Sequence, residues 1–132
     1  MSKNILADFF VATHSYTRAR AIADGVLINA SGPAKAFGFK IPVAVTASVW
    51  ADCVVWDQNA ETLPQNDAQR LWDLLSAARL ETGYSPNPTR QCFKLLRVAH
   101  GGSHPELVEL IAYVDIDDQG EPLMTIMQPG ED

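Results

Sequence analysis

The chain has 132 residues, a formal net charge of -6, and 47% hydrophobic and 20% charged side chains. A chain of this size and ordinary composition can bury its own core, so we expect one globular domain over residues 1–132. The acidic balance leaves no cationic excess to displace phosphate counterions, which argues against direct nucleic-acid binding. No apolar stretch approaches the roughly 20 residues that span a bilayer, so we expect no membrane segment and a cytoplasmic protein.

The first third of the chain shows signals for a short capped helix. Ser15 or Thr17 can serve as its N-cap, and Asp24-Gly25 supplies the left-handed conformation that ends a helix. Helical spacing predicts that Ala19, Ile22 and Ala23 turn inward.

Short apolar runs then alternate with a second helix signal. Residues 26–28 and 41–45 are expected as strands, and Ser31 is expected to cap a brief helix through residue 36. Because Pro42 removes one ladder donor, the second run is predicted to be an edge strand or a strand start.

Two amphipathic helices follow in the middle of the chain. Thr46 is expected to cap the first, whose apolar stripe is Val49, Trp50, Cys53 and Val54. After a polar loop over residues 57–66, Asn66 or Asp67 opens the strongest helix signal, with its stripe formed by Leu71, Leu74, Leu75 and Ala78. Trp50 and Trp72 are expected in the core, and Trp56 is the best candidate for an exposed anchor. The two cysteines, Cys53 and Cys92, are expected to be buried thiols, although their spacing does not exclude a disulfide.

The pattern changes to period two after a connector over residues 85–88. Strands are expected over 92–98, 107–116 and 123–127, with an acidic turn over 117–120. Short loops between consecutive strands predict an antiparallel meander. We therefore predict an α+β fold, in which a three-stranded antiparallel meander packs against helices and short N-terminal strands are added.

The charges are segregated along the chain. No lysine or arginine follows Arg97, whereas eight acidic residues do. A polarised field of this kind biases which partners a domain meets. We expect contacts with an unknown protein partner through a set of late acidic residues and one aromatic: Trp56, Asp115, Asp117, Asp118, Glu121, Glu131 and Asp132.

Two clusters resemble metal sites but are better explained as turns. His100 and His104, with His14, could converge on a metal, yet His-x3-His is a metal arrangement chiefly on helices, and here two glycines lie between the histidines. Asp115 and Asp117 begin like a calcium loop, but strands on both sides and the missing closing Glu favour an acidic β-turn. We assign no metal and no cofactor.

An alternative enzyme site gathers at the first helix. His14, Tyr16, Arg18 and Arg20 precede Gly25-Val26-Leu27, and this short stretch resembles the opening of ADP-ribosyltransferase-like domains. Arginines can hold a phosphate and a histidine can act as acid or base. The resemblance implies a small nucleotide- or NAD-using enzyme with its site near His14 and Arg18.

A second resemblance covers nearly the whole chain. It rests on six stretches: Tyr16–Ala19, Ala23–Ile28, Pro42–Thr46, Val49–Cys53, Arg70–Leu75 and Gly120–Asp132. Together they resemble an uncharacterised family of small proteins, a domain of unknown function, found on plasmids, phages and other mobile elements. The resemblance implies a mobile-element context, but no activity and no catalytic residues.

Three functions are compatible with these observations. The first is an acidic accessory protein that binds a host or element-encoded protein, such as a nucleic-acid-binding host defence protein whose basic groove it occupies by mimicking phosphates. The second is the small enzyme described above. The third is a structural module that forms homodimers through an open sheet face or an edge strand.

Overall fold

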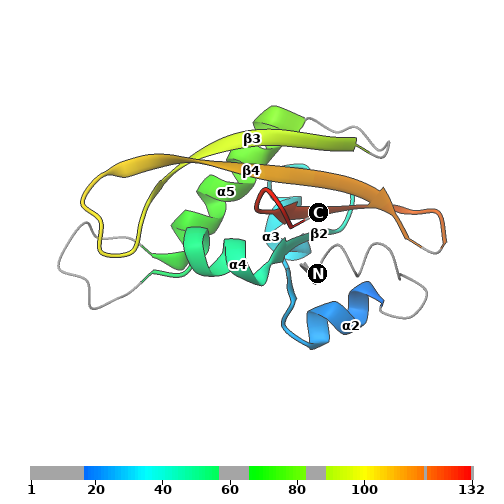
Figure 1. The fold of residues 1–132 in the computed structure, drawn as a ribbon. Coiled ribbons are helices and arrows are strands. Elements are labelled where there is room, and N and C mark those ends of the chain that lie inside the picture. Colours follow the sequence, from blue (N-terminus) through cyan, green and yellow to red (C-terminus); the bar gives the residue numbers. More distant parts are fainter. Residues whose placement is uncertain (1–16, 57–65, 83–88, 118, 132) are drawn as a thin grey trace.

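The computed structural model describes residues 17–56, 66–82, 89–117 and 119–131, which form helices packed on one mixed sheet (Figure 1). The helical elements are α2 (Arg18–Ala23), α3 (Ser31–Lys35), α4 (Ala47–Val49), the π-helix η1 (Trp50–Val54) and α5 (Asp67–Thr82). The strands are β1 (Leu27–Asn29), β2 (Val43–Thr46), β3 (Thr89–Val98), β4 (Pro105–Ile116) and β5 (Pro122–Met127).

The five strands form a single sheet in the order β1-β2-β5-β4-β3. β3, β4 and β5 are antiparallel neighbours, so the predicted α+β class and C-terminal meander are confirmed. β2 pairs antiparallel with β1 and parallel with β5, which joins the two halves of the chain. Of the two alternatives for residues 41–45, an edge strand or a strand start, the structure has the second, because β2 lies inside the sheet and begins directly after Pro42. Pro42 precedes the strand, and its carbonyl accepts a hydrogen bond from Met124 N at 2.9 Å.

The two faces of the sheet are covered unequally. On one face α3, α4, η1 and α5 bury the larger apolar cluster, which includes Phe93 of β3 and Leu110 of β4. On the other face Ala21 of α2 packs over a small cluster with Ile111 and Met127. Figure 1 shows α2 set apart from the other helices.

Three predicted helix starts agree with the structure. Thr17 Oγ1 accepts from Arg20 N at 3.1 Å and Thr46 Oγ1 accepts from Val49 N at 3.3 Å. Asn66 Oδ1 accepts from Gln69 N at 2.7 Å, at the start of α5. The prediction for Ser31 was wrong, because Ala30 is the N-cap of α3. The Ser31 hydroxyl instead exchanges hydrogen bonds with the backbone of Val43 and ties α3 to β2.

Several burial predictions need correction. In α2 only Ala21 is fully buried, whereas Ala19 and Ala23 are exposed, because the helix lies on the sheet through a single turn. Trp72 was expected in the core, but it is 52% exposed and packs its ring 4.2 Å from that of Phe37. Cys92 is exposed at the sheet surface, and only Cys53 is a buried thiol. The expected loop over 57–66, apart from Asn66, the connector over 85–88 and the segment before residue 17 lie outside the described residues.

Candidate functional site

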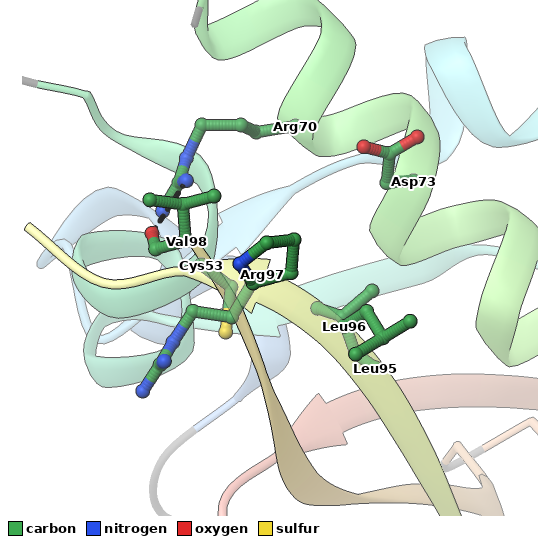
Figure 2. Close-up of a pocket in the computed structure, with 8 residues that line it drawn as sticks. Cys53, Arg70, Asp73, Leu95, Leu96, Arg97 and Val98 are labelled. Atoms are coloured by element: carbon green, nitrogen blue, oxygen red, sulfur yellow. Dashed lines mark hydrogen bonds between the residues drawn. The ribbon is translucent and has the colours of Figure 1, made fainter. Parts of the chain in front are cut away.

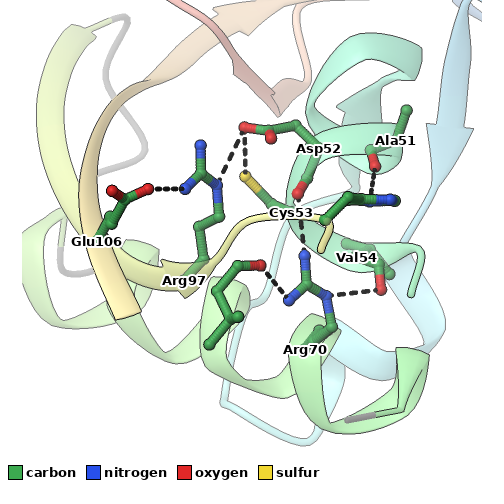
Figure 3. Close-up of polar contacts among 9 residues, drawn as sticks. Ala51, Asp52, Cys53, Val54, Arg70, Arg97 and Glu106 are labelled. Carbon is green, nitrogen blue, oxygen red and sulfur yellow. Dashed lines mark hydrogen bonds and ion pairs between the residues drawn. The ribbon is translucent and has the colours of Figure 1, made fainter. Parts of the chain in front are cut away.

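Arg70 on α5 is the most deeply buried cation of the described residues, with 3% of its surface exposed. Its guanidinium donates to three backbone carbonyls: Nε to Val54 O at 3.2 Å, Nη1 to Val98 O at 2.8 Å and Nη2 to Asp52 O at 2.9 Å (Figure 3). Two of these carbonyls belong to η1 and the third ends β3. A planar guanidinium with five donors suits such a divergent set. Burial lowers the pKa of Arg70 from its ordinary value. The residue therefore joins α5, η1 and β3 at one point.

A second arginine lies beside the first. Arg97 of β3 donates from Nε to Asp52 Oδ2 at 3.3 Å, and its Nη1 lies 3.7 Å from Glu106 Oε1 across the hairpin (Figure 3). The Cys53 thiol contacts the same Asp52 oxygen at 3.6 Å. Burial, together with the charge of Asp52, raises the pKa of Cys53 to about 12.

Arg70 and Arg97 border a small hollow of about 110 Å³ together with Cys53 and Asp73 (Figure 2). Arg70 extends into this region from α5 and Arg97 from β3. A thiol held protonated at neutral pH is a poor nucleophile, because the thiolate is the reactive form. The guanidinium of Arg70 is already occupied by carbonyls. Arg97 Nη1, in contrast, is buried without a hydrogen-bond partner among the described residues.

The hairpin between β3 and β4 carries the two histidines of the suggested metal site. His100 Nε2 lies 2.9 Å from Ala51 O, and its ring centroid lies 6.0 Å from that of Trp56. His104 Nδ1 is 3.4 Å from the Ser103 hydroxyl. Gly101 adopts a φ of 75°, a left-handed conformation that favours glycine, so the glycines serve the turn. Among the described residues, no three His, Cys, Asp or Glu side chains gather as metal ligands.

Trp56 does not provide the exposed anchor that the sequence suggested. It is only 5% exposed, and the guanidinium carbon of Arg70 lies 4.9 Å from its ring centroid. Asp67 Oδ1 accepts a hydrogen bond from Trp56 N at 2.9 Å, so backbone and side chain are both engaged. The residues that follow Trp56 are polar and gave no sign of its burial, because Arg70, which covers the ring, lies on another helix.

The late acidic residues occupy separate parts of the molecule. Asp115, Asp117 and Glu121 lie at the β4–β5 turn, where Asp117 Oδ1 accepts from Gln119 N and Glu121 N, both at 2.9 Å. Glu131 instead lies by the start of α4. Asp118 and Asp132 fall outside the described residues.

Glu131 is committed to contacts inside the fold. One carboxylate oxygen accepts from Ser48 Oγ at 2.8 Å, from Thr46 Oγ1 at 3.0 Å and from Gln128 N at 2.7 Å. These bonds fasten the C-terminal turn to the β2–α4 junction. Three donors on one oxygen leave Glu131 better suited to a structural role than to partner contact.

The alternative enzyme site is only partly described. His14 and Tyr16 lie outside the described residues, and Arg20 is exposed on α2. Arg18 donates from Nη2 to Met124 O at 2.6 Å and from Nη1 to Thr125 Oγ1 at 2.9 Å. Burial lowers the pKa of Arg18 to about 10. The Arg18 side chain thus ties α2 to β5.

An open area on β3 and β4 was not predicted as a site. Leu96 and Leu107 are opposite each other in the strand register and are 61% and 62% exposed. Around them lie exposed residues on the same side of the two strands, and we call the whole set the β3–β4 face. Its members are Arg90, Cys92, Lys94 and Leu96 of β3 and Leu107 and Glu109 of β4. Alternation over residues 92–96 was the available signal: the odd positions bury Phe93 and Leu95, which leaves Leu96 outward.

Comparison with known proteins places this α+β domain in a family. The chain belongs to the family of unknown function DUF6573, whose model matches residues 6–132. This agrees with the resemblance to an uncharacterised family, and the family description supplies no activity. No curated protein and no solved structure matches the chain.

No helix in the described parts of the chain combines the length and apolar character needed to cross a bilayer.

Proposed function

We propose that this protein acts by binding another protein through the β3–β4 face. The observation that carries the proposal is the pair Leu96 and Leu107, which lie side by side with more than 60% of each residue exposed. Single exposed apolar residues are common, but an adjacent pair bordered by charged side chains is typical of an interaction surface. Lys94 and Glu109 are opposite each other next to the pair and supply such a border.

The expected strength follows from the exposed area of the two leucines. Full burial of one leucine contributes about 1.5–3 kcal/mol, so covering two that are about 60% exposed would contribute about 2–4 kcal/mol. This corresponds to roughly a 30- to 1,000-fold change in Kd. The free energy gained by burying the two leucines is therefore large enough to decide whether a complex forms.

Binding is better supported than catalysis by the chemistry of the described residues. Arg70 donates to backbone carbonyls and Arg97 Nε to Asp52, while burial raises the pKa of the Cys53 thiol to about 12. The small enzyme near His14 and Arg18 remains an alternative, and binding of NAD or nucleotides in a thermal-shift assay would favour it.

A more specific form of the proposal is an accessory protein of a mobile element that acts in the cytoplasm against a host defence protein. The sequence resemblance supports the mobile-element context, and two free cysteines suit a reducing compartment. The acidic β4–β5 turn, with Asp115, Asp117 and Glu121, is the part that would enter a basic groove. Complexes of this kind weaken steeply as salt rises.

The test compares the wild-type protein with the double variant Leu96→Ser/Leu107→Ser as bait in host lysate. We expect the variant to fold normally, because both side chains are already exposed, and to lose the proteins that the wild type retains. The double variant Asp117→Asn/Glu121→Gln distinguishes binding through the β3–β4 face from binding through the acidic β4–β5 turn. It should weaken only a complex made through the turn. Equal recovery by wild type and leucine variant would refute binding through the β3–β4 face.

A further inference from the structure

We propose that a groove beside α3 binds a small molecule in which a carboxylate is joined to an apolar chain, as in a medium-chain fatty acid. The groove has a volume of about 620 Å³, which lies within the range of small-molecule binding sites. Its walls come from α3 and from the segment that connects α3 to β2. Phe39 of this segment belongs to the larger apolar cluster with Phe93 and Leu95, on the side of the sheet opposite the β3–β4 face. The groove is therefore a second site, and it goes beyond the proposed function.

The walls of the groove are held in place by hydrogen bonds within the fold. Arg79 Nε of α5 donates to Phe37 O at 3.1 Å. The Ser31 hydroxyl accepts from Val43 N at 3.0 Å, which joins the start of α3 to the start of β2. Gly38 lies in the turn after α3 with a φ of 86°, a left-handed conformation that favours glycine. A ligand thus meets a shape that is already formed, and little ordering opposes its binding.

Two lysines supply the charge that a carboxylate would meet. Lys35 and Lys40 both line the groove and are exposed, and neither ammonium group has a hydrogen bond or ion pair with another described residue. None of the described residues that line the groove is acidic. Because the chain carries a net charge of -6, this is a local reversal of its charge. A hydrogen bond from an ammonium group to a carboxylate is stronger than one between neutral groups. Charge complementarity therefore selects an anion.

The rest of the groove is mainly apolar. Phe39 is 5% exposed and Ile41 packs against the same apolar cluster, so their positions are fixed by the core. Pro42 adds a third apolar side chain, which is exposed. An inorganic anion would leave this apolar surface in contact with water. An uncharged hydrocarbon would leave the two ammonium groups without a protein-bound partner. The two features together favour a ligand with a charged head and an apolar chain.

The shape of the groove sets the expected dependence on chain length. The groove is open rather than enclosed, so a bound chain would keep part of its surface in water. Full burial of one methylene group strengthens binding about fourfold, and half burial about twofold. We therefore expect Kd to rise about fourfold from decanoate to octanoate and about fourfold again to hexanoate.

The experiment titrates the full chain with decanoate at low salt and follows the backbone amides by two-dimensional NMR. We expect the largest shifts in residues 31–42, and the chain-length series above measured at the same amides. Decanol is the uncharged counterpart of decanoate. It should bind more weakly, because it lacks the charge that the lysines meet.

Charge variants test the head group. Lys35→Gln and Lys40→Gln should each raise the Kd of decanoate about threefold, and the double variant about tenfold. The affinity for decanol should stay the same in these variants. Lys94→Gln is the matched control, because Lys94 is an exposed lysine on the opposite side of the sheet and should leave decanoate binding unchanged. Lys35→Arg/Lys40→Arg should retain binding, since the charge is kept.

Four results would overturn the inference. They are no binding of decanoate, acetate that binds as tightly as decanoate, equal weakening by Lys94→Gln and by the double lysine variant, and shifts confined to residues 92–109 that disappear in Leu96→Ser/Leu107→Ser. The proposed function does not depend on the groove. A lysate partner that is lost with Leu96→Ser/Leu107→Ser while decanoate fails to bind would leave that function standing and refute the groove alone.

Discussion

Replacement of Arg70 by methionine tests whether the buried guanidinium holds three elements together. Methionine keeps much of the side-chain length but removes all donors, so the carbonyls of Asp52, Val54 and Val98 lose their partner. A buried acceptor left without a partner costs about 1–3 kcal/mol, and three such groups, partly rehydrated, give about 3–5 kcal/mol. The cation–π contact with Trp56 would be lost as well.

This loss is a large fraction of the total stability, since domains of this size have unfolding free energies of about 5–15 kcal/mol. Urea unfolding followed by far-UV circular dichroism measures it, with the m-value as a check on two-state behaviour. Arg70→Lys should fall between wild type and Arg70→Met, because an ammonium group cannot reach three divergent carbonyls at once. Arg20→Met is the control, since Arg20 is exposed on α2 and should change stability by less than about 0.5 kcal/mol.

The reasoning would be refuted if Arg70→Met lost less than about 1 kcal/mol relative to Arg20→Met. If Arg70→Met fails to fold, the unfolding free energy of Arg70→Lys is compared with that of Arg20→Met instead.

Three further predictions concern burial and charge. Leu110 is buried and Leu107 on the same strand is exposed. Leu110→Ala should therefore lower the unfolding free energy by about 2–5 kcal/mol, and Leu107→Ala by less than about 1 kcal/mol. Similar losses in the two variants would show that the β3–β4 face is covered. Glu131→Ala should lower the unfolding free energy by about 1–3 kcal/mol. Glu131→Gln should lower it by less, because an amide oxygen can still accept a hydrogen bond from Ser48. Urea unfolding measures both losses, and an unchanged stability in Glu131→Ala would contradict the role of the carboxylate. A maleimide should label Cys92 in the native protein and Cys53 only after unfolding, as read by mass spectrometry. The thiol of an unfolded chain ionises near its ordinary pKa of 9.0, whereas folded Cys53 stays protonated up to about 12. Unfolding then releases a proton, so stability should fall from about pH 9 to 12, and more in wild type than in Cys53→Ala.

The local elements of this fold can be predicted from the sequence because their signals are local. Thr17, Thr46 and Asn66 precede helices as capping residues, and apolar residues at every second position mark β4. Each of these signals depends on groups within a few residues of one another.

The order of the strands could not be predicted in the same way. The parallel pairing of β2 with β5 joins Val43 to Met124, and nothing in either stretch specifies the other. Pro42 illustrates the limit: a missing donor is compatible with an edge strand and equally with the residue just before an internal strand. Which of these applies depends on β5, which lies far along the chain from Pro42.

The candidate site was the least predictable part. Trp56 borders a polar stretch and suggested exposure, but Arg70 covers it from another helix. Glu131 belongs to an acidic C-terminal region, yet it bonds with Thr46 and Ser48 from the middle of the chain. Charge segregation along a sequence therefore did not become one gathered acidic patch among the described residues, because the fold distributes neighbours in sequence over distant positions.

The position of β5 has a consequence for how the chain folds during synthesis. β5 lies between β2 and β4, so until it forms, β1 and β2 share no strand partner with the β3–β4 hairpin. A nascent polypeptide that has emerged only as far as Gly120 thus holds two half-sheets with exposed inner edges. Completion of the core waits for β5 to leave the ribosome, and the earlier segments must avoid unwanted pairing until then.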